Sequence, residues 1–278
     1  MKLGTFTEPS TGFNATPAIG DILYYDASMA SWNRLGTGTD GQTCKVGYGD
    51  AFTVLQSTFD GLNGATAYTD PIAGAYTFVS TAQLSTAQYK FTTGASLLLN
   101  GSTDYVTLPD SDSWYFATGD FTIDFWVRFA TLPTPTEIQL ILNQGTGAGN
   151  PQIQVGVRND GGTYIWRLYG YTDASNSVDV SQNAAVALAI NTWYHIVMVR
   201  NGSNFYIFQD GVQCGTTQVS TYSFANCDTT LHIGSDFSGG YYFNGFIDEL
   251  RISKGIARWT ANFVPPTVAY GLQPKWVT

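Results

Sequence analysis

The sequence predicts an all-β protein, built as a two-sheet sandwich or a barrel. Short strand-like stretches recur along the chain, separated by Gly-, Asn- and Asp-containing turns at intervals of roughly 8–12 residues. Helical patterns are nearly absent: only residues 255–260 and, more weakly, 184–190 suggest short helices. Aromatic residues make up 15% of the chain and glycines number 30, as suits a β protein with many tight turns.

Residues 121–129 form the clearest strand, because apolar and other residues alternate along it with a period of two. One face carries Phe121, Ile123, Phe125, Val127 and Phe129, and the opposite face carries Thr122, Asp124, Trp126 and Arg128. We expect the first face to point into the core.

The remaining strands are predicted in the same way. Asn159-Asp160-Gly161-Gly162 and Asn201-Gly202-Ser203 are typical hairpin turns, and Asp210-Gly211 is a further tight turn. The apolar run at 138–142 is consistent with a strand covered on both faces. The predicted strands are 21–26, 138–142, 152–158, 163–169, 193–200, 204–209, 231–234 and 243–253.

Composition excludes several classes of protein. The net charge is −9, and charged residues make up only 12% of the chain, about half the usual ~25%. No apolar run approaches the ~20 residues that span a bilayer, and the start of the chain has no apolar region typical of a signal peptide. A hydrophobic content of 44% argues against disorder. Twelve cations in an excess of acid argue against nucleic-acid binding.

Cysteine and histidine are scarce and scattered. Cys44, Cys214 and Cys227 are an odd number, which argues against a disulfide framework. Cys214 and Cys227 could pair across a loop, although two isolated thiols are the simpler interpretation. His195 and His232 lie far apart in sequence and no CxxC motif is present, so we expect no zinc site.

Residues 1–53 differ in composition and in strand pattern from the rest of the chain. They are rich in Gly and Thr, and their one strand-like core is short. So small a segment buries little apolar surface alone, so we expect it to pack against the second domain, another copy of the chain or another protein. We therefore divide the chain into an attachment or oligomerisation module, 1–53, and a main domain, 54–278.

Several motifs of the main domain occur in the order found in one known family. They are Phe59-Asp60-Gly61, the 94–101 and 104–109 segments, Gly119 to Val127, Trp193 to Ile196, Phe205 to Gly211, and Asn244-Gly245-Phe246-Ile247-Asp248-Glu249-Leu250-Arg251-Ile252. Over residues 54–270 the chain resembles the laminin G-like, concanavalin A-like jelly-roll domains. The resemblance implies a two-sheet antiparallel jelly-roll sandwich, preceded by a small β-rich module.

The tail 253–263 is similar to versions of this domain in bacteriophage structural proteins, and residues 20–42 resemble a short module of phage tail and fibre proteins. The resemblance implies a virion protein, made in the host cytoplasm and displayed on the particle surface. Its partners would be other capsid or tail proteins, further copies of itself in a homotrimer, and host surface glycans. A capsid-decorating or cement protein is the alternative, and a glycan hydrolase or lyase is less favoured.

Catalysis is not expected. Glycoside hydrolysis needs two carboxylates across a cleft, but residues 123–126 offer only Asp124. Asp248 and Glu249 are adjacent, so on a regular strand they would point to opposite faces. The two other glutamates, Glu8 and Glu137, lie in turn- or proline-rich contexts.

A structural calcium ion is implied by the resemblance, because such jelly rolls often carry one near the chain start and the last long strand. The corresponding residues here are Asp60 and Asp248. The alternative is structural: Asp248 would accept backbone hydrogen bonds, and Asp60 would cap a turn.

Exposed aromatic residues would bind glycans by stacking on sugar rings. Tyr241 and Tyr242 follow Ser238-Gly239-Gly240 on a predicted loop tip and are the best candidates. Other aromatic candidates are Tyr169, Tyr171, Trp126 and Trp166, although core packing explains most aromatic residues in a sandwich. Three cations near the C-terminus, Arg251, Lys254 and Arg258, are too few to predict an anionic-polysaccharide site.

Overall fold

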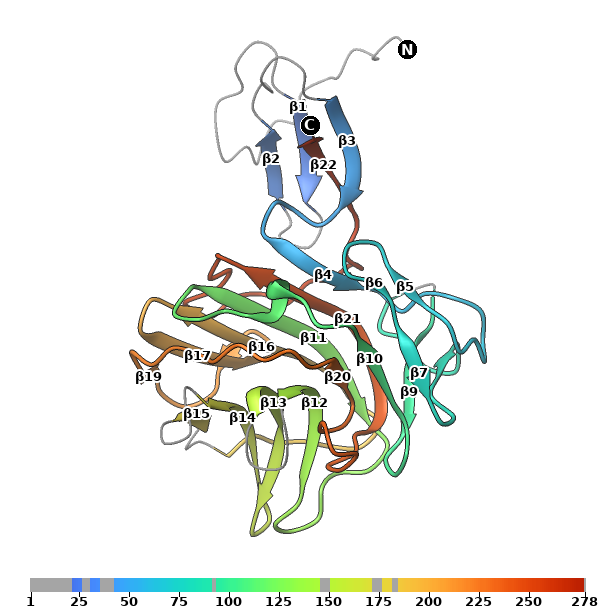
Figure 1. The fold of residues 1–278 in the computed structure, drawn as a ribbon, viewed down its shortest axis with the longest axis vertical. Helices are drawn as coiled ribbons and strands as arrows, with labels where there is room; N and C mark the ends of the chain where they lie inside the picture. The colour runs from blue at the N-terminus through green and yellow to red at the C-terminus, as the bar shows by residue number, and fades with distance from the viewer. Residues whose placement is uncertain are drawn as a thin grey trace. The chain divides into compact units, whose positions relative to one another are not determined.

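Two large antiparallel sheets form a jelly-roll sandwich in residues 52–265 (Figure 1). The structure is a computed structural model, which describes residues 22–26, 31–35, 43–91, 94–145, 151–171, 177–181 and 185–277. Across these ranges the one helical element is a 3₁₀ turn, η1 (Asp112–Trp114). The predicted fold class is confirmed, as a sandwich and not a barrel.

Each large sheet combines strands from distant parts of the chain. The seven-stranded sheet has the order β15 (Ser177–Ser181), β14 (Thr163–Tyr171), β13 (Pro151–Asp160), β12 (Ile138–Gly145), β20 (Leu231–Ile233), β10 (Tyr105–Leu108), β7 (Thr77–Val79). The nine-stranded sheet has the order β18 (Val212–Gln213), β17 (Asn204–Gln209), β16 (Trp193–Asn201), β11 (Phe121–Phe129), β21 (Asn244–Lys254), β9 (Ser96–Asn100), β8 (Gln83–Ser85). In addition, β19 (Gln218–Val219) pairs with β17, and β4 (Thr53–Ser57) pairs with β21, while β5 (Thr69–Asp70) and β6 (Gly74–Ala75) pair with each other.

The core lies between the two large sheets. All five residues of the predicted inner face of β11 are completely buried, which confirms its alternation. Trp166 of β14 is buried among Phe125 and Phe129, with ring centroids 6.3 and 6.2 Å apart, and its Nε1 donates to Gln209 Oε1 at 2.9 Å. Trp166 is therefore a core residue and does not face a ligand.

The predicted helices are wrong wherever the structure describes them. Residues 255–260 are not helical, because the Thr122 side chain of β11 donates to Ile256 O at 3.0 Å and accepts from Arg258 N at 2.9 Å. In the described residues 185–190, Val186 N instead donates to Tyr164 O at 3.0 Å. Long-range hydrogen bonds thus outweigh the local preference for helix in both segments.

Residues 255–265, called here the C-terminal strap, cover part of the outer face of the nine-stranded sheet. Trp259 and Phe263 stack with centroids 4.4 Å apart and pack on Val197 and Phe208. Phe263 N donates to Gly211 O at 2.9 Å. Gly211 has a φ of 78°, and a Cβ there would lie 2.0 Å from Phe263 O, so only glycine fits.

The remaining described strands belong to a separate unit, residues 1–51 with 266–278. Here β1 (Ile22–Asp26) pairs with β2 (Ser31–Leu35), and β3 (Thr43–Tyr48) pairs with β22 (Leu272–Val277). The sequence placed residues up to 278 in the jelly roll, whereas β22 joins the N-terminal unit through this pairing. A search of the described residues for a helix of sufficient length and apolarity to cross a membrane finds none.

Candidate functional site

Asp248 sits at an irregularity in β21. Along β11, Asp124 pairs with Arg251 but Trp126 pairs with Asp248, so Glu249 and Leu250 together oppose a single residue. Glu249 has a φ of 50°. Such a bulge resets the alternation: Ile247 and Leu250 both enter the core, although a regular strand would separate them. The expectation that adjacent residues 248 and 249 simply alternate is therefore wrong.

The Asp248 carboxylate is desolvated. Its side chain is 3% exposed, and its oxygens accept from Lys90 N at 2.8 Å and Glu249 N at 2.9 Å. Burial and, to a smaller extent, the negative charge of Asp60 raise the pKa of Asp248, while the two backbone donors and the Lys90 charge lower it, and together they bring it to about 7. A buried carboxylate whose charge is so poorly compensated favours either a proton or a cation.

Asp60 is exposed and lies near enough to Asp248 for their charges to interact. Its Oδ1 accepts from Ala95 N at 3.3 Å. A Cβ on Gly94 would fall 2.0 Å from that oxygen, so the glycine lets the carboxylate lie against the backbone. The structure therefore brings together the two residues that the resemblance singled out.

These residues fit a calcium ion bound by few carboxylates. Calcium takes six to eight oxygen ligands, many of which can be carbonyls or water. Carboxylate oxygens have about two acceptor positions each, so one backbone donor on each Asp248 oxygen leaves room for a cation. Within the described part of the chain, no three His, Cys, Asp or Glu side chains form a metal-holding group. Calcium remains a prediction, and backbone oxygens and water would supply its other ligands.

A second buried charge cluster lies beneath the C-terminal strap. Arg251 Nε and Nη2 donate to the two oxygens of Asp124 at 3.0 and 3.1 Å, and His195 Nε2 lies 3.7 Å from Asp124 Oδ2. Burial alone would raise the pKa of Asp124, but Arg251 and His195 hold it well below its usual range. Burial lowers the pKa of His195 despite its carboxylate neighbour. Asp124 is buried in its ion pair with Arg251 and cannot reach a substrate.

The outer face of the seven-stranded sheet carries a row of polar and aromatic side chains, one from each strand. Strand pairing aligns them across the whole sheet. We call this the outer row; its members are Asp179, Tyr169, Gln154, Asn143, His232, Thr107 and Thr77. The residues flanking them in each strand, such as Leu168 and Val155, enter the core. The row therefore points away from the core.

Aromatic clusters stand at two places along the outer row. Around Tyr169, the Arg167 guanidinium lies 3.9 Å from the ring centroid and pairs with Asp179 at 3.0 Å, and Tyr171 makes an edge contact at 5.5 Å. Further along, Tyr105 stacks on His232 with centroids 5.1 Å apart. These contacts fix the orientation of the rings.

The predicted Tyr241-Tyr242 loop lies beside the second cluster. Tyr242 approaches Tyr105 at 6.5 Å, and the Tyr241 side chain is 53% exposed. Tyr241 O accepts from Leu140 N at 2.9 Å, and Phe237 N of the same loop donates to Asn143 Oδ1 at 3.0 Å. The loop is thus anchored beside the outer face, with the Tyr241 ring exposed and the Tyr242 ring half-buried.

The other candidates have structural roles. Trp126 is buried against His195, with centroids 4.9 Å apart, and Lys90 Nζ lies 3.8 Å from its ring. Lys254 Nζ donates to Asp112 O at 2.6 Å, and Arg258 donates to Ser253 Oγ at 2.8 Å. The cysteines 214 and 227 are free buried thiols; Cys44 lies outside the residues whose side chains the structure describes.

Sequence reasoning missed the outer row and the Asp124–Arg251 pair. Both depend on strand pairing between distant segments. The sequence does contain a signal for the pair: Asp124 and Arg251 are charged residues that each stand between two apolar residues in a predicted strand.

Comparison with known proteins agrees with the two-sheet jelly-roll architecture. Residues 100–258 match the family described as the concanavalin A-like lectin/glucanases superfamily, and the chain belongs to it. Domain 4 of AbnA, an extracellular arabinanase of Geobacillus stearothermophilus solved with arabinotriose, aligns with a TM-score of 0.54 at 17% identity, over 74% of this chain and 93% of that one.

Two further relatives share only part of their length with this chain. A structure of botulinum neurotoxin type C, whose cell entry is described as dependent upon interaction with two ganglioside molecules, aligns with a TM-score of 0.52 at 14% identity, over 73% of this chain and 48% of that one. The adhesion G-protein coupled receptor V1 of Danio rerio is 24% identical over 135 residues, which are 48% of this chain and 2% of the receptor. These likenesses concern the fold.

Proposed function

We propose that the chain is a non-enzymatic carbohydrate-binding protein whose outer row, with the Tyr241-Tyr242 loop, contacts glycans. The observation that carries the proposal is the alignment of seven polar or aromatic side chains across one sheet face. Aromatic rings present flat apolar faces to sugar rings. The half-buried amide of Gln154 lies between the two aromatic clusters and supplies donor and acceptor groups for hydroxyls. Asn143 is 2% exposed and instead holds the Tyr241-Tyr242 loop by accepting from Phe237 N.

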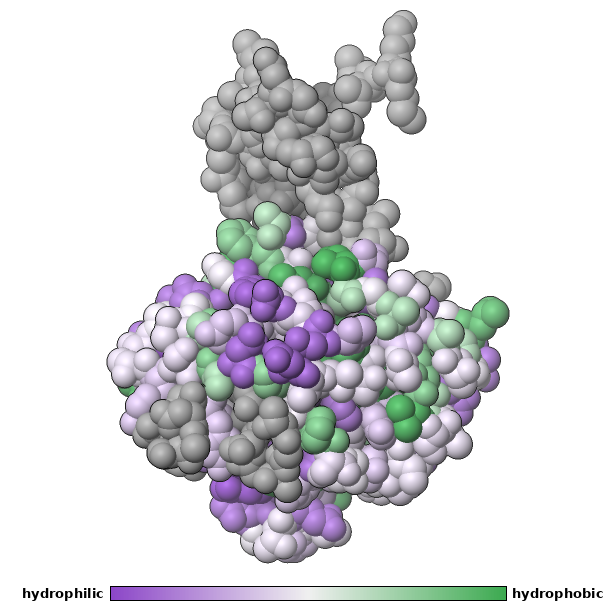
Figure 2. Space-filling view, in the orientation of Figure 1, coloured by the Kyte–Doolittle hydropathy of each residue, from purple (hydrophilic) through white to green (hydrophobic). Residues whose placement is uncertain are grey.

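The nature of the surface supports a neutral ligand. Charged residues make up 12% of the chain. Figure 2 shows one face on which residues of intermediate hydropathy cover much of the surface, purple residues gather near the middle and at the lower end, and green residues are dispersed. Such a surface neither attracts polyanions strongly nor forms a large exposed apolar patch.

Relatives of the same fold support the same class of ligand. The AbnA domain was solved in complex with arabinotriose, and the toxin is described as interacting with gangliosides. Both ligands are carbohydrates or carry them, so the jelly roll is compatible with a glycan-binding role here.

Carboxylate geometry argues against catalysis. Asp248 has the raised pKa of a general acid, but it is 3% exposed and both oxygens already accept backbone hydrogen bonds. Asp124 is buried against Arg251. Neither carboxylate is placed to protonate a glycosidic oxygen.

We further propose that the protein is a bacteriophage particle component, with the N-terminal unit attaching and self-associating, as a homotrimer, and the jelly roll facing outward. The described strands of that unit form two-stranded sheets, which are marginal in isolation. Weak single-site binding would gain strength from many copies on one particle.

Replacing Tyr169 or Tyr241 with Ala should weaken binding to an array of neutral polysaccharides about tenfold each, because each change removes a stacking ring worth roughly 1.4 kcal/mol. Affinity is measured by biolayer interferometry on array hits. Tyr222→Ala is the matched control, since Tyr222 is 48% exposed compared with 53% for Tyr241 and lies outside the outer row. Equal losses in all three variants would contradict a site on this face.

A chain restricted to residues 52–265 should be soluble, folded and monomeric but absent from assembled particles. Sedimentation and circular dichroism test folding, and immunogold labelling of particles tests incorporation. Incorporation of the shortened chain would refute the attachment role of the N-terminal unit. Labelling of capsid faces, together with no binding on the glycan array, would instead support capsid decoration.

A further inference from the structure

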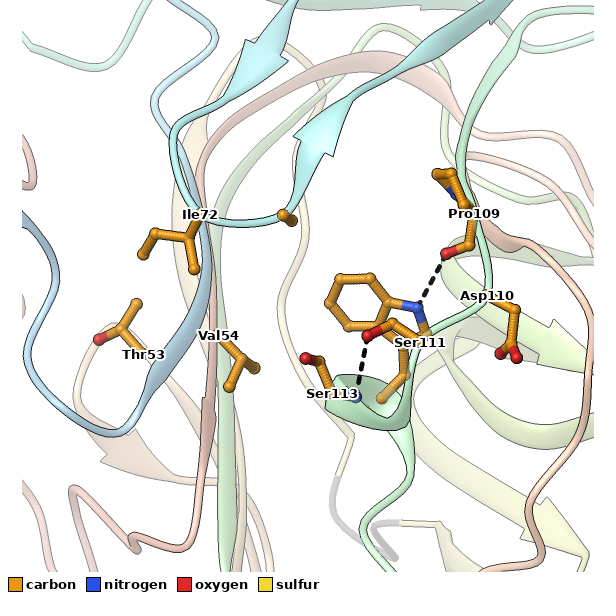
Figure 3. A pocket seen from close by; sticks show the side chains of 9 residues that line it. Thr53, Val54, Ile72, Pro109, Asp110, Ser111 and Ser113 are labelled. Carbon is orange, nitrogen blue, oxygen red and sulfur yellow. Dashed lines mark hydrogen bonds between the residues drawn. The ribbon is translucent and has the colours of Figure 1, made fainter.

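A pocket of about 290 Å³ opens between β4, the β5–β6 turn and the segment that enters η1. Figure 3 shows Val54 and Ile72 on one side of it and Ser111 and Ser113 on the other. Ala73 extends the apolar side, and the Trp114 indole contributes to the lining. The pocket is therefore apolar on one wall and rich in hydroxyls on the other.

The apolar wall is held in place by a buried carboxylate. Asp70 Oδ1 accepts from Ile72 N at 2.8 Å and Ala73 N at 2.7 Å, while its Oδ2 accepts from Gln56 N at 2.9 Å and Ser57 Oγ at 2.6 Å. Asp70 is 1% exposed. These four hydrogen bonds tie the β5–β6 turn to β4, so this wall does not have to order when a ligand enters.

The hydroxyl wall is fixed in a similar way. Trp114 Nε1 donates to Pro109 O at 3.2 Å, and Ser111 Oγ accepts from Ser113 N at 3.2 Å (Figure 3). Gln144 Nε2 donates to Asp110 Oδ1 at 2.9 Å. The Ser113 hydroxyl makes no hydrogen bond to any described residue and is available to a ligand.

We propose that this pocket binds a single neutral sugar residue; the inference rests on the proposed carbohydrate-binding function and adds a second subsite to it. The pocket holds the volume of roughly ten water molecules, which matches one sugar ring with its hydroxyls but not an oligosaccharide. A sugar ring has an apolar face and a hydroxyl edge, so it suits walls of these two kinds.

Charge selects against acidic sugars. Asp110 places a carboxylate in the pocket lining. The neighbouring cations are already bound within the protein: Lys254 Nζ donates to Asp112 O at 2.6 Å, and Arg258 Nη2 donates to Thr53 Oγ1 at 3.2 Å. The Asp110 carboxylate already accepts from Gln144 Nε2, and an anionic sugar would gain no ion pair from these two cations.

The test titrates methyl glycosides of glucose, galactose, mannose and arabinose into the full ¹⁵N-labelled chain. The Trp114 indole signal is assigned as the one lost in Trp114→Phe. We expect at least one glycoside to shift this signal saturably, and Ser113→Leu, which fills the pocket, to weaken that glycoside at least tenfold. Ser223→Leu is the matched control, because Ser223 is also half-buried and lies away from the pocket.

Two outcomes overturn the pocket proposal: none of the four glycosides shifts the Trp114 signal, or Ser113→Leu and Ser223→Leu bind equally well while both keep the unfolding temperature of the parent. The polysaccharide array separates this failure from failure of the outer row. Loss of array binding in Tyr241→Ala with no Trp114 response refutes the pocket alone. A Trp114 response with array binding unchanged in Tyr169→Ala and Tyr241→Ala refutes the outer row alone.

Discussion

Replacing Arg251 with Met should lower the free energy of unfolding by about 3–5 kcal/mol, the usual cost of removing one partner of a buried ion pair. Arg251 supplies two hydrogen bonds to Asp124, and the side chains are 5% and 0% exposed. Without the guanidinium, the Asp124 carboxylate would remain buried beneath the C-terminal strap. Urea denaturation followed by tryptophan fluorescence measures the loss.

Two comparisons separate this cost from a general effect of losing an arginine. Arg158→Met breaks an exposed pair with Asp160, whose side chains are 31% and 60% exposed, and should change stability by less than about 1 kcal/mol. The double variant Asp124→Leu/Arg251→Met should recover part of the loss, because no buried charge is left uncompensated. A double variant less stable than Arg251→Met would contradict the argument.

The loss of unfolding free energy caused by Arg251→Met should also depend on pH. In the parent, Arg251 and His195 keep the pKa of Asp124 low, so its stabilising contribution is lost only in strong acid. In the variant, burial acts on Asp124 without the guanidinium, and protonation removes the uncompensated charge. The deficit should therefore shrink on acidification from pH 7 toward pH 5, and a deficit independent of pH would show that lost packing dominates.

Local features of the fold were predictable because they depend on neighbouring residues. The inner face of β11 follows from a period of two, and the turns at residues 159–162 and 210–211 follow from glycines that adopt positive φ, as Gly161, Gly162 and Gly211 do. The helix predicted at 255–260 is wrong because the side chain of Thr122 in β11, more than a hundred positions away, hydrogen-bonds to two of its backbone groups.

The candidate sites were predictable only in part. Asp60 and Asp248 were found through resemblance, and Tyr241 and Tyr242 through loop composition. The outer row was not found, since each member is an ordinary strand residue until seven strands are put in register. The bulge at Glu249 arises where β21 pairs with β11, its neighbour in the nine-stranded sheet and more than a hundred residues earlier in the chain, and no pattern within 243–253 specifies that register.

Calcium chloride should raise the unfolding temperature of EDTA-treated protein much more at pH 8 than at pH 5. Calcium ligands must be ionised, so binding competes with protons. Burial and Asp60 place the pKa of Asp248 at about 7. At pH 8 the carboxylate is charged, and a bound cation would neutralise its buried negative charge. At pH 5 the carboxylate is protonated and binds calcium poorly.

Without calcium, Asp248 makes stability decrease as pH rises, whereas an aspartate in an ion pair makes stability increase as pH rises. An unfolded aspartate has a pKa of about 3.9. Between about pH 4 and pH 7 the folded state holds a proton that the unfolded state has released, so stability falls as pH rises and levels off above pH 7. The span from 3.9 to about 7 corresponds to an upper value of about 4 kcal/mol.

Two variants distinguish a buried acid from a calcium ligand. Asp248→Asn should flatten this slope and abolish the calcium response, whereas Asp60→Asn should abolish the calcium response and leave most of the slope, because burial is its larger cause. Asp236→Asn, at the Tyr241-Tyr242 loop, should change neither. A calcium response that survives in both Asp60→Asn and Asp248→Asn would refute the site. A pH dependence of stability without any calcium response in the parent would leave Asp248 as a structural acid that accepts a hydrogen bond from Lys90 N.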